Sequence, residues 1–155
     1  MNDNKKSFSQ KIVVNRKIKY NFSVEETFDA GIVLLGWEVK ALRHGKVNIT
    51  NSYISFKSSE AYLIGSQFVP VSQSNLYMIY EPNRIRKILL RKNEIIYLYN
   101  KVHKSKLTIV VLSMFFRNNW CKTKIGVAKG RQIKDKREYK KQNEWKREKN
   151  RFLKK

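Results

Sequence analysis

The sequence predicts a mainly β protein: a small OB-fold-like barrel of about six strands, two or three peripheral helices, and a basic C-terminal tail that is disordered when the protein is free. Several short segments alternate apolar and polar residues, which is the period of half-buried strands. This alternation stops near residue 128, and charged residues dominate after it. Periodicity alone is also compatible with an SH3-like barrel or a five-stranded sheet.

The first strand signal is long, and the next two are short. Residues 20–34 alternate apolar and polar positions, and the acidic pair at 25–26 together with Gly31 indicates a bulge or bend, which a small barrel requires. Residues 52–57 and 61–67 alternate as well. They are joined by a short polar connection, so they predict a β-hairpin.

A second hairpin is predicted near the end of the barrel. Residues 107–116 are apolar on both faces, which is typical of a central strand. A turn leads to residues 120–127, where Trp120, Lys122 and Lys124 share one face and small or apolar residues share the other. We therefore expect this hairpin to have a basic outer face.

Two segments predict helices. Residues 36–45 have helical apolar spacing, and Gly45 is suited to the C′ position that ends a helix. Residues 84–99 show helical spacing with one basic side, and Asn83, at the end of a loop over residues 71–83, is a plausible N-cap.

The chain divides into a barrel domain, residues 1–128, and a basic tail, residues 129–155. The tail has too few apolar side chains to offset the entropy of ordering, so we expect it to be mobile in the free protein and to fold against a polyanionic partner. Asp135 with Glu138 resembles a capping box, which predicts a helix from about residue 136. Trp145 and Phe152 share a stripe of that helix, which could instead pack on the barrel.

The charge of the whole chain indicates a nucleic-acid partner. The 155 residues include 34 Lys and Arg against 12 Asp and Glu, a net charge of +22. Both the barrel and the tail are basic, which favours a large folded RNA over a point contact; a compositional bias toward lysine is the alternative explanation. The single cysteine and the absence of a long apolar run predict a cytoplasmic protein that does not bind membranes.

Catalytic and metal-binding patterns are absent from the sequence. His44 and His103 have no neighbouring ligand residues, and Cys121 alternates with apolar residues as a small buried side chain would. No glycine-rich phosphate loop is present. We therefore expect a protein that is not an enzyme and uses no metal or cofactor; the competing hypothesis of a small nuclease or RNA-modifying enzyme would require one of these three residues.

Basic residues interleaved with aromatic ones predict RNA-binding surfaces. Three clusters stand out in the barrel, in the loop before residue 20, in the first helix and in the second predicted helix. Asp29 adds a carboxylate that could read a base edge or a ribose hydroxyl. With Leu89, which the family resemblance given below adds, the candidate RNA-binding residues are Arg16, Lys17, Lys19, Tyr20, Asp29, Lys40, Arg43, Lys46, Arg86, Lys87, Leu89 and Arg91.

The order of several motifs resembles the bacterial small protein B family, the SsrA-binding proteins. These motifs are Asn-Arg-Lys at 15–17, Gly-Trp-Glu-Val-Lys-Ala-Leu-Arg at 36–43, Arg-Ile-Arg-Lys-Ile-Leu-Leu at 84–90, Lys-Ile-Gly-Val-Ala-Lys-Gly at 124–130 and Asp-Lys-Arg at 135–137. The resemblance runs from about residue 12 to the end.

This resemblance implies a protein that binds the tRNA-like domain of transfer-messenger RNA (tmRNA, or SsrA RNA) and delivers it to stalled ribosomes in trans-translation. We expect the protein to be a monomer. It implies that Asp29, Arg43, Leu89 and the loop at 16–19 face the RNA, and that the tail folds as a helix in the small-subunit decoding site and messenger channel. The candidate ribosome-binding residues of the tail are Lys129, Arg131, Lys134, Asp135, Lys136, Arg137, Tyr139, Trp145, Lys146 and Arg147.

Three positions depart from the family pattern. Tyr20 stands where members of the family often have histidine, Lys134 where some members have histidine, and Arg91 where asparagine or histidine is common. Contacts at these positions are expected to differ in detail. The alternative function is a general binder of structured RNA, or a ribosome-associated protein, without a single preferred RNA.

Overall fold

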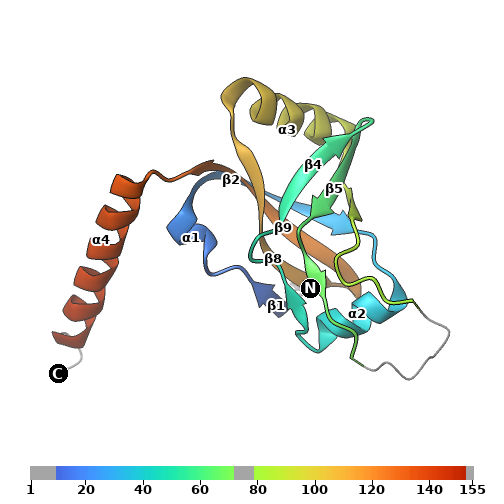
Figure 1. Cartoon of the computed structure of the whole chain (residues 1–155), viewed down its shortest axis with the longest axis horizontal. Helices are drawn as coiled ribbons and strands as arrows, with labels where there is room; N and C mark the ends of the chain where they lie inside the picture. Colours follow the sequence, from blue (N-terminus) through green and yellow to red (C-terminus); the bar gives the residue numbers. More distant parts are fainter. Residues whose placement is uncertain (1–9, 72–78, 153–155) are drawn as a thin grey trace, which may run out of the picture.

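The structure, a computed structural model, describes residues 10–71 and 79–152 (Figure 1). Part of the predicted loop at 71–83 and the end of the tail lie outside these residues. The nine strands are β1 (Gln10–Val14), β2 (Phe22–Ile32), β3 (Val47–Asn48), β4 (Tyr53–Lys57), β5 (Glu60–Ile64), β6 (Gln67–Phe68), β7 (Arg86–Leu89), β8 (Thr108–Arg117) and β9 (Trp120–Gly130). The four helices are α1 (Ile18–Asn21), α2 (Gly36–Arg43), α3 (Lys92–Ser105) and α4 (Ile133–Phe152).

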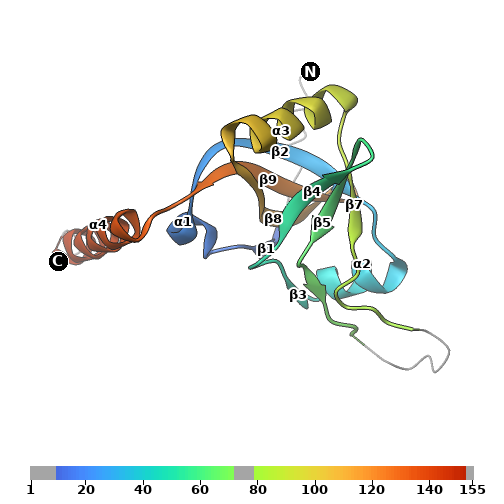
Figure 2. The same cartoon turned by 45° about the horizontal axis from the view of Figure 1, so that its top comes forward.

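Six strands close into a ring, which confirms the predicted barrel. The hydrogen-bonded order is β8–β4–β5–β7–β2–β9, and β9 pairs with β8 to complete the circle, while β1 lies outside along β8. All pairs are antiparallel. Helix α3 lies across one end of the barrel, and α2 lies at the other (Figures 1 and 2).

The register of β2 explains the acidic break in its sequence. The β2–β9 ladder shifts between Val24 and Glu26, as expected for a bulge there. At Gly31 the ladder is regular instead, because Gly31 pairs with Leu89 on one side and Lys122 on the other. The bulge was therefore predicted correctly at residues 25–26 and wrongly at Gly31.

The barrel interior is filled from alternate positions of the strands. Thr123, Ile125 and Val127 of β9 point inward and are fully buried, and they meet Ile109 and Val111 of β8. Both hairpins have two-residue turns in which both residues have positive φ, which matches the twist of the strands. The two predicted hairpins are confirmed.

The predicted helix over residues 84–99 is wrong. Residues 86–89 form strand β7, in which Arg86 and Ile88 point inward while Lys87 and Leu89 point outward. Helix α3 begins only at Lys92, so Asn83 is not an N-cap. The apolar residues spaced by three and four positions belong here to two consecutive elements, strand β7 and helix α3. The periodicity of one sequence cannot distinguish this arrangement from a single long helix.

Helix α2 ends as predicted. The amide of Gly45 donates to the carbonyl of Leu42 at 2.9 Å, and the amide of Lys46 donates to the carbonyl of Ala41 at 2.9 Å. This is the Schellman pattern, in which the residue after the C-cap has positive φ, and Gly45 has a φ of 68°. The chain then leaves α2 in a defined direction toward β3.

A buried ion cluster connects α2 to β7. Glu38 is completely buried, accepts hydrogen bonds from Arg86 Nε at 2.9 Å and Arg84 Nη2 at 2.7 Å, and accepts a third from the amide of Leu35 at 2.7 Å. The Arg86 guanidinium also lies 3.9 Å from the centre of the Phe68 ring. Burial alone would raise the pKa of Glu38, but these hydrogen bonds and the arginine charges outweigh it and lower the pKa below 4.5.

The tail is a helix in the structure, contrary to the disorder predicted for the free protein. Helix α4 projects away from the barrel (Figures 1 and 2) and begins at Ile133, not at residue 136. Asp135 lies in its first turn and accepts a hydrogen bond from the Gln132 amide at 3.3 Å. Lysine, arginine, glutamate and glutamine all favour helix locally, so the tail can form a helix although it buries little apolar surface.

Removing the buried carboxylate tests the cluster. Glu38→Ala leaves two arginines without their partner, so the free energy of unfolding in urea is expected to fall by about 3–5 kcal/mol. Because the pKa of Glu38 is lowered on folding, its contribution is complete above about pH 4.5 and is lost as the pH falls below that value. The difference between wild type and variant should therefore shrink in acid.

The matched control is Glu60→Ala. Glu60 pairs with Lys87 at the surface, where both side chains are about 40% exposed (41% and 43%), so no measurable loss of stability is expected. Equal destabilisation by the two substitutions would contradict the assignment of Glu38 as the main connection between α2 and β7.

Candidate nucleic-acid interface

Two basic surfaces of the described chain hold ten of the twenty-two predicted binding residues. The first, which we call the β9 face, consists of outward residues of β2, β7 and β9: Asp29, Gly31, Leu89, Trp120, Lys122 and Lys124. The second, the α1–tail surface, consists of Arg16, Lys17, Lys19, Tyr20, Lys129, Arg131, Lys136 and Tyr139.

The barrel register arranges the β9 face in rows. Gly31 lies between Leu89 and Lys122, and Asp29 lies opposite Lys124 in the next row. The ammonium of Lys124 is 3.8 Å from the Asp29 carboxylate, and both side chains are 39% exposed. A ligand can therefore reach both charges, so this face offers a hydrogen-bond acceptor beside cations and not a uniform positive field.

Three cations lie on α2 or just after it, and one of them, Arg43, borders this face. Lys40, Arg43 and Lys46 are all exposed, and Arg43 occupies the last turn of the helix. Its guanidinium lies 5.5 Å from the centre of the Phe116 ring at the rim of the barrel. The predicted second cluster is therefore present as an accessible group.

The residues of the third predicted cluster do not lie on one surface in the structure. Arg86 is completely buried in the ion cluster with Glu38, so the prediction that it contacts RNA is wrong. Lys87 is on the outside but forms an ion pair with Glu60, and Arg91 is exposed at the start of α3. Because β7 alternates, Arg86 and Lys87 must lie on opposite sides of the barrel wall.

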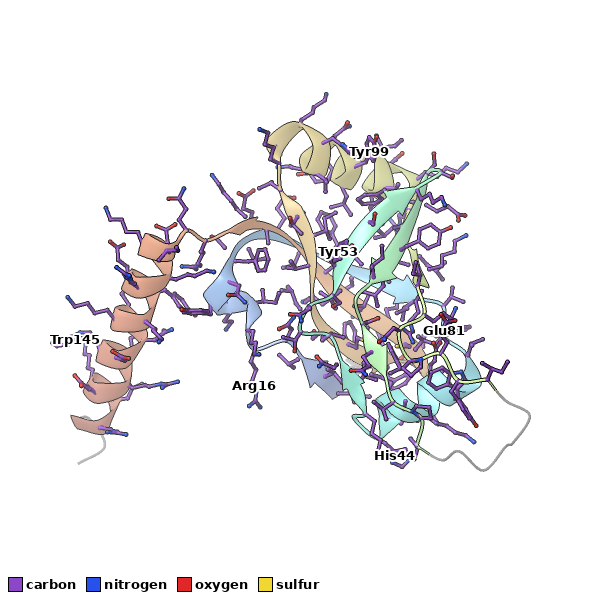
Figure 3. The ribbon with its side chains drawn as sticks, viewed as in Figure 1. Arg16, His44, Tyr53, Glu81, Tyr99 and Trp145 are labelled. Carbon is purple, nitrogen blue, oxygen red and sulfur yellow. The ribbon has the colours of Figure 1, made fainter. Side chains whose placement is uncertain are left out.

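Asn15 anchors the basic loop of the α1–tail surface. Its side-chain amide donates to the carbonyls of Ile49 at 2.9 Å and Val111 at 3.3 Å. Helix α1 then packs through Ile18 on a small cluster with Val110 and Ala128 outside the barrel. These contacts hold the loop in place while Arg16 extends away from the barrel into solvent (Figure 3).

The tail joins this surface at Arg131. Its amide donates to the carbonyl of Asn21 at 2.9 Å, and its guanidinium lies 4.5 Å from the centre of the Tyr139 ring. Lys136 lies 5.9 Å from the Tyr20 ring. Strand β9 continues through Lys129 and Gly130, so the barrel extends two residues beyond the predicted limit at 128.

The remainder of α4 has no packing partner among the described residues. Trp145 is 70% exposed and points away from the barrel (Figure 3), so the alternative in which it packs on the body does not apply to this structure. The other predicted tail residues, apart from the half-buried Arg131, Lys136 and Tyr139, are exposed: Lys129, Lys134, Asp135, Arg137, Lys146 and Arg147.

The structure adds residues that the sequence prediction did not include in the site. Trp120, Lys122 and Lys124 lie on the β9 face beside Asp29 and Leu89. Their alternation had indicated a basic outer face, but only the ring closure brings that face next to β2 and β7. Glu38 was not singled out either, because a lone glutamate in a helix gives no signal of burial.

Two of the three candidate catalytic residues have ordinary structural surroundings. His103 stacks on Tyr99 with ring centres 4.1 Å apart on α3, and burial raises the pKa of the Cys121 thiol to about 12. Within the described ranges, no three His, Cys, Asp or Glu side chains form a group that could hold a metal ion. None of the described helices is long and apolar enough to cross a membrane.

The model of the SmpB protein family matches residues 12–155. The chain belongs to the SmpB family. It is 65% identical over 153 residues to an SsrA-binding protein of Buchnera aphidicola subsp. Baizongia pistaciae (strain Bp), covering 99% of this chain and 96% of that protein. A chain from the solved structure described as "tmRNA-SmpB: a journey to the center of the bacterial ribosome" superimposes with a TM-score of 0.66 at 36% identity, over 80% of this chain and 87% of that one. This SmpB family membership agrees with the resemblance found from the motifs.

The contrast between Arg43 and Arg86 gives a test of the interface. Arg43→Ala should weaken RNA binding and reduce the slope of log K against log salt by about one, because one phosphate contact is lost. Arg86→Met should instead lower the free energy of unfolding and leave the salt slope of the folded protein unchanged. Titrations at several salt concentrations, with urea unfolding alongside, measure both; a changed slope for Arg86→Met would contradict its structural role.

The start of α4 gives a second test. Asp135→Ala removes the carboxylate that accepts from the Gln132 amide, so hydrogen exchange across residues 133–152 should become faster, corresponding to a loss of about 0.5–2 kcal/mol of helix stability. Glu148→Ala, near the other end of the helix, is the control and should leave exchange unchanged or slower. Equal effects of the two would show that Asp135 has no special capping role.

Proposed function

We propose that this protein binds the tRNA-like domain of tmRNA through its barrel and delivers that RNA to stalled ribosomes for trans-translation. The observation that carries the proposal is the 65% identity to an SsrA-binding protein over 99% of the chain, which includes the tail as well as the barrel. The two exposed basic surfaces and the net charge of +22 supply the physical means of holding large RNAs.

The proposal assigns the barrel to tmRNA. The tRNA-like domain is contacted by Asp29, Leu89 and Arg91. It is also contacted by Lys40 and Arg43 of α2, by Lys46 just after this helix, and by the loop of Arg16, Lys17 and Lys19 with Tyr20. Phosphates position such a complex, whereas an acceptor such as Asp29 distinguishes hydroxyls and base edges from phosphates, which it repels. Lys87 remains in its ion pair with Glu60, and Arg86 stabilises the fold through its buried ion pair with Glu38.

The proposal assigns the tail to the ribosome. Helix α4 is charged all round, and its four acidic residues leave a clear excess of lysine and arginine. Such a helix suits a channel lined by RNA phosphates on every side, such as the decoding site and messenger channel of the small subunit. Trp145 is free on its surface to stack on a ribosomal base.

We further propose that the protein acts by binding alone, without catalysis, metal or cofactor. Trans-translation takes place on ribosomes, so this function belongs to the cytoplasm. A general binder of structured RNA is the second candidate, since positive charge by itself attracts any RNA. The acidic Asp29 within the β9 face favours a selective partner, and competition by unrelated structured RNA separates the two candidates.

Deleting residues 133–155 tests the division of labour. Strand β9 ends at Gly130, and no residue of α4 belongs to the barrel core, so the shortened protein retains the whole barrel. It should bind the tRNA-like domain of tmRNA with an affinity within about fivefold of the full chain, corresponding to less than about 1 kcal/mol. It should also fail to support peptide tagging on ribosomes stalled at truncated messages.

Two results would contradict the proposal. Loss of RNA binding in the shortened protein would show that the tail, and not the barrel, holds tmRNA. Equal binding of tmRNA and an unrelated folded RNA by the full chain would favour the general RNA binder.

A further inference from the structure

Trp120 is an exposed aromatic residue at the tip of the β8–β9 hairpin, and the described barrel does not use it. It exposes 76% of its surface, whereas Trp37 exposes 8%. A tryptophan side chain can bury on the order of 150–250 Å². The hairpin therefore presents a large planar apolar surface, and a ligand that buried this surface would gain binding free energy.

The backbone fixes the side of the sheet from which this side chain projects. Asn118 and Asn119 have φ values of 49° and 63°, which is a two-residue turn matched to the twist of the hairpin, and Arg117 pairs directly with Trp120. Alternation along β9 then places Trp120 on the same outer face as Lys122 and Lys124. Trp120 thus projects from a set position of a strand on the β9 face and not from a flexible loop.

An apolar groove of about 730 Å³ begins at Trp120. Leu89 and Gly31 lie among its walls, together with Val39, Phe116 and Cys121. A Cβ added at Gly31 would lie 3.2 Å from Cβ of Leu89, so the missing side chain leaves room for Leu89 to lie over the strand. Burial keeps the pKa of Cys121 near 12, so its thiol is neutral and adds no charge to the groove.

The charged residues that line this groove or contact its lining are positive, and Asp29, one row away, is paired with Lys124. Lys122 lines it, Arg43 lies over Phe116 at its rim, and Arg117 is the cross-strand partner of Trp120. None of the described residues that line it is acidic. An apolar groove that has an exposed indole in its wall and cations around it suits a nucleobase whose flanking phosphates meet the rim, and it disfavours a basic protein segment.

We propose that this groove binds one unpaired nucleobase of the RNA, stacked on the Trp120 indole against Leu89, with the adjoining phosphates on Lys122 and Arg43. The inference rests on the proposed function for the identity of the RNA and adds a residue and a mode of recognition to it. A base within a duplex has both faces covered by its neighbours, so only a base in a loop, bulge or end can enter. Trp120 thereby selects RNA with an exposed base at a defined place.

The test measures binding of the full-length chain to a transcript of the tRNA-like domain of tmRNA. Trp120→Ala should weaken binding about 5- to 150-fold, the range for removing one base–aromatic stack. Trp120→Phe should stay within about threefold of wild type because an aromatic face remains. Trp120→Leu keeps apolar bulk but has no aromatic face, so it should lose most of the affinity that alanine loses.

The salt dependence separates stacking from charge. Trp120→Ala should leave the slope of log K against log salt unchanged, whereas Lys122→Ala should reduce it by about one. Ile96→Ala, an exposed apolar substitution on α3, is the matched control and should bind like wild type. With a fully paired RNA duplex as probe, Trp120→Ala should bind as well as wild type.

The outcomes also separate this inference from the proposed function. If wild type does not bind the tRNA-like domain in preference to other RNA, the proposed function fails. If wild type binds it and Trp120→Ala or Trp120→Leu binds equally well, only the stacking site is overturned. An equal loss on the paired duplex would also overturn it, because Trp120 would then contact the helix backbone.

Discussion

Strand β9 hydrogen-bonds to β2 along one edge and to β8 along the other, and this double pairing closes the barrel. Both edges of β9 are therefore hydrogen-bonded to a neighbouring strand. The pairing also assigns each side chain of β9 either to the barrel interior or to the outer surface. Ile125 and Val127 must then fill the core, while Lys122 and Lys124 must face solvent. A slip of one residue would exchange these two sets, so burial of the apolar set holds the basic set on the surface.

The second constraint is the buried ion cluster at the end of the barrel. Glu38 from α2 reaches Arg86 in β7, and Arg84 closes the cluster from the surface side. The same helix carries Arg43, and the same strand carries Leu89, so one buried interaction holds two parts of the proposed RNA-binding surface together. Its stabilising effect depends on both partners being present, because either charge alone would be costly inside the protein.

The tail is stabilised by different interactions from the barrel. Arg131, just before its helix, lies beside the ring of Tyr139, and Lys136 lies beside the ring of Tyr20. Beyond Tyr139 nearly all of the described helix residues are exposed to solvent. Local helix propensity and the Asp135 carboxylate favour the helix, while tertiary packing contributes little. A segment of this kind can present the same charges to a surrounding RNA surface without rearranging the barrel that carries it.

The sequence by itself determined the barrel class, both hairpins, the end of α2 at Gly45 and the basic character of the tail, because each depends on short-range alternation or on local backbone preference. It also determined the family, through motifs spread over the whole chain. It could not determine that Arg86 is buried and Lys87 is not, because lysine and arginine look alike in a pattern until a strand register assigns them to a side. Only the tertiary structure decided that Trp120, Leu89, Gly31 and Asp29 share one face, since strands distant in the sequence become neighbours when the ring closes.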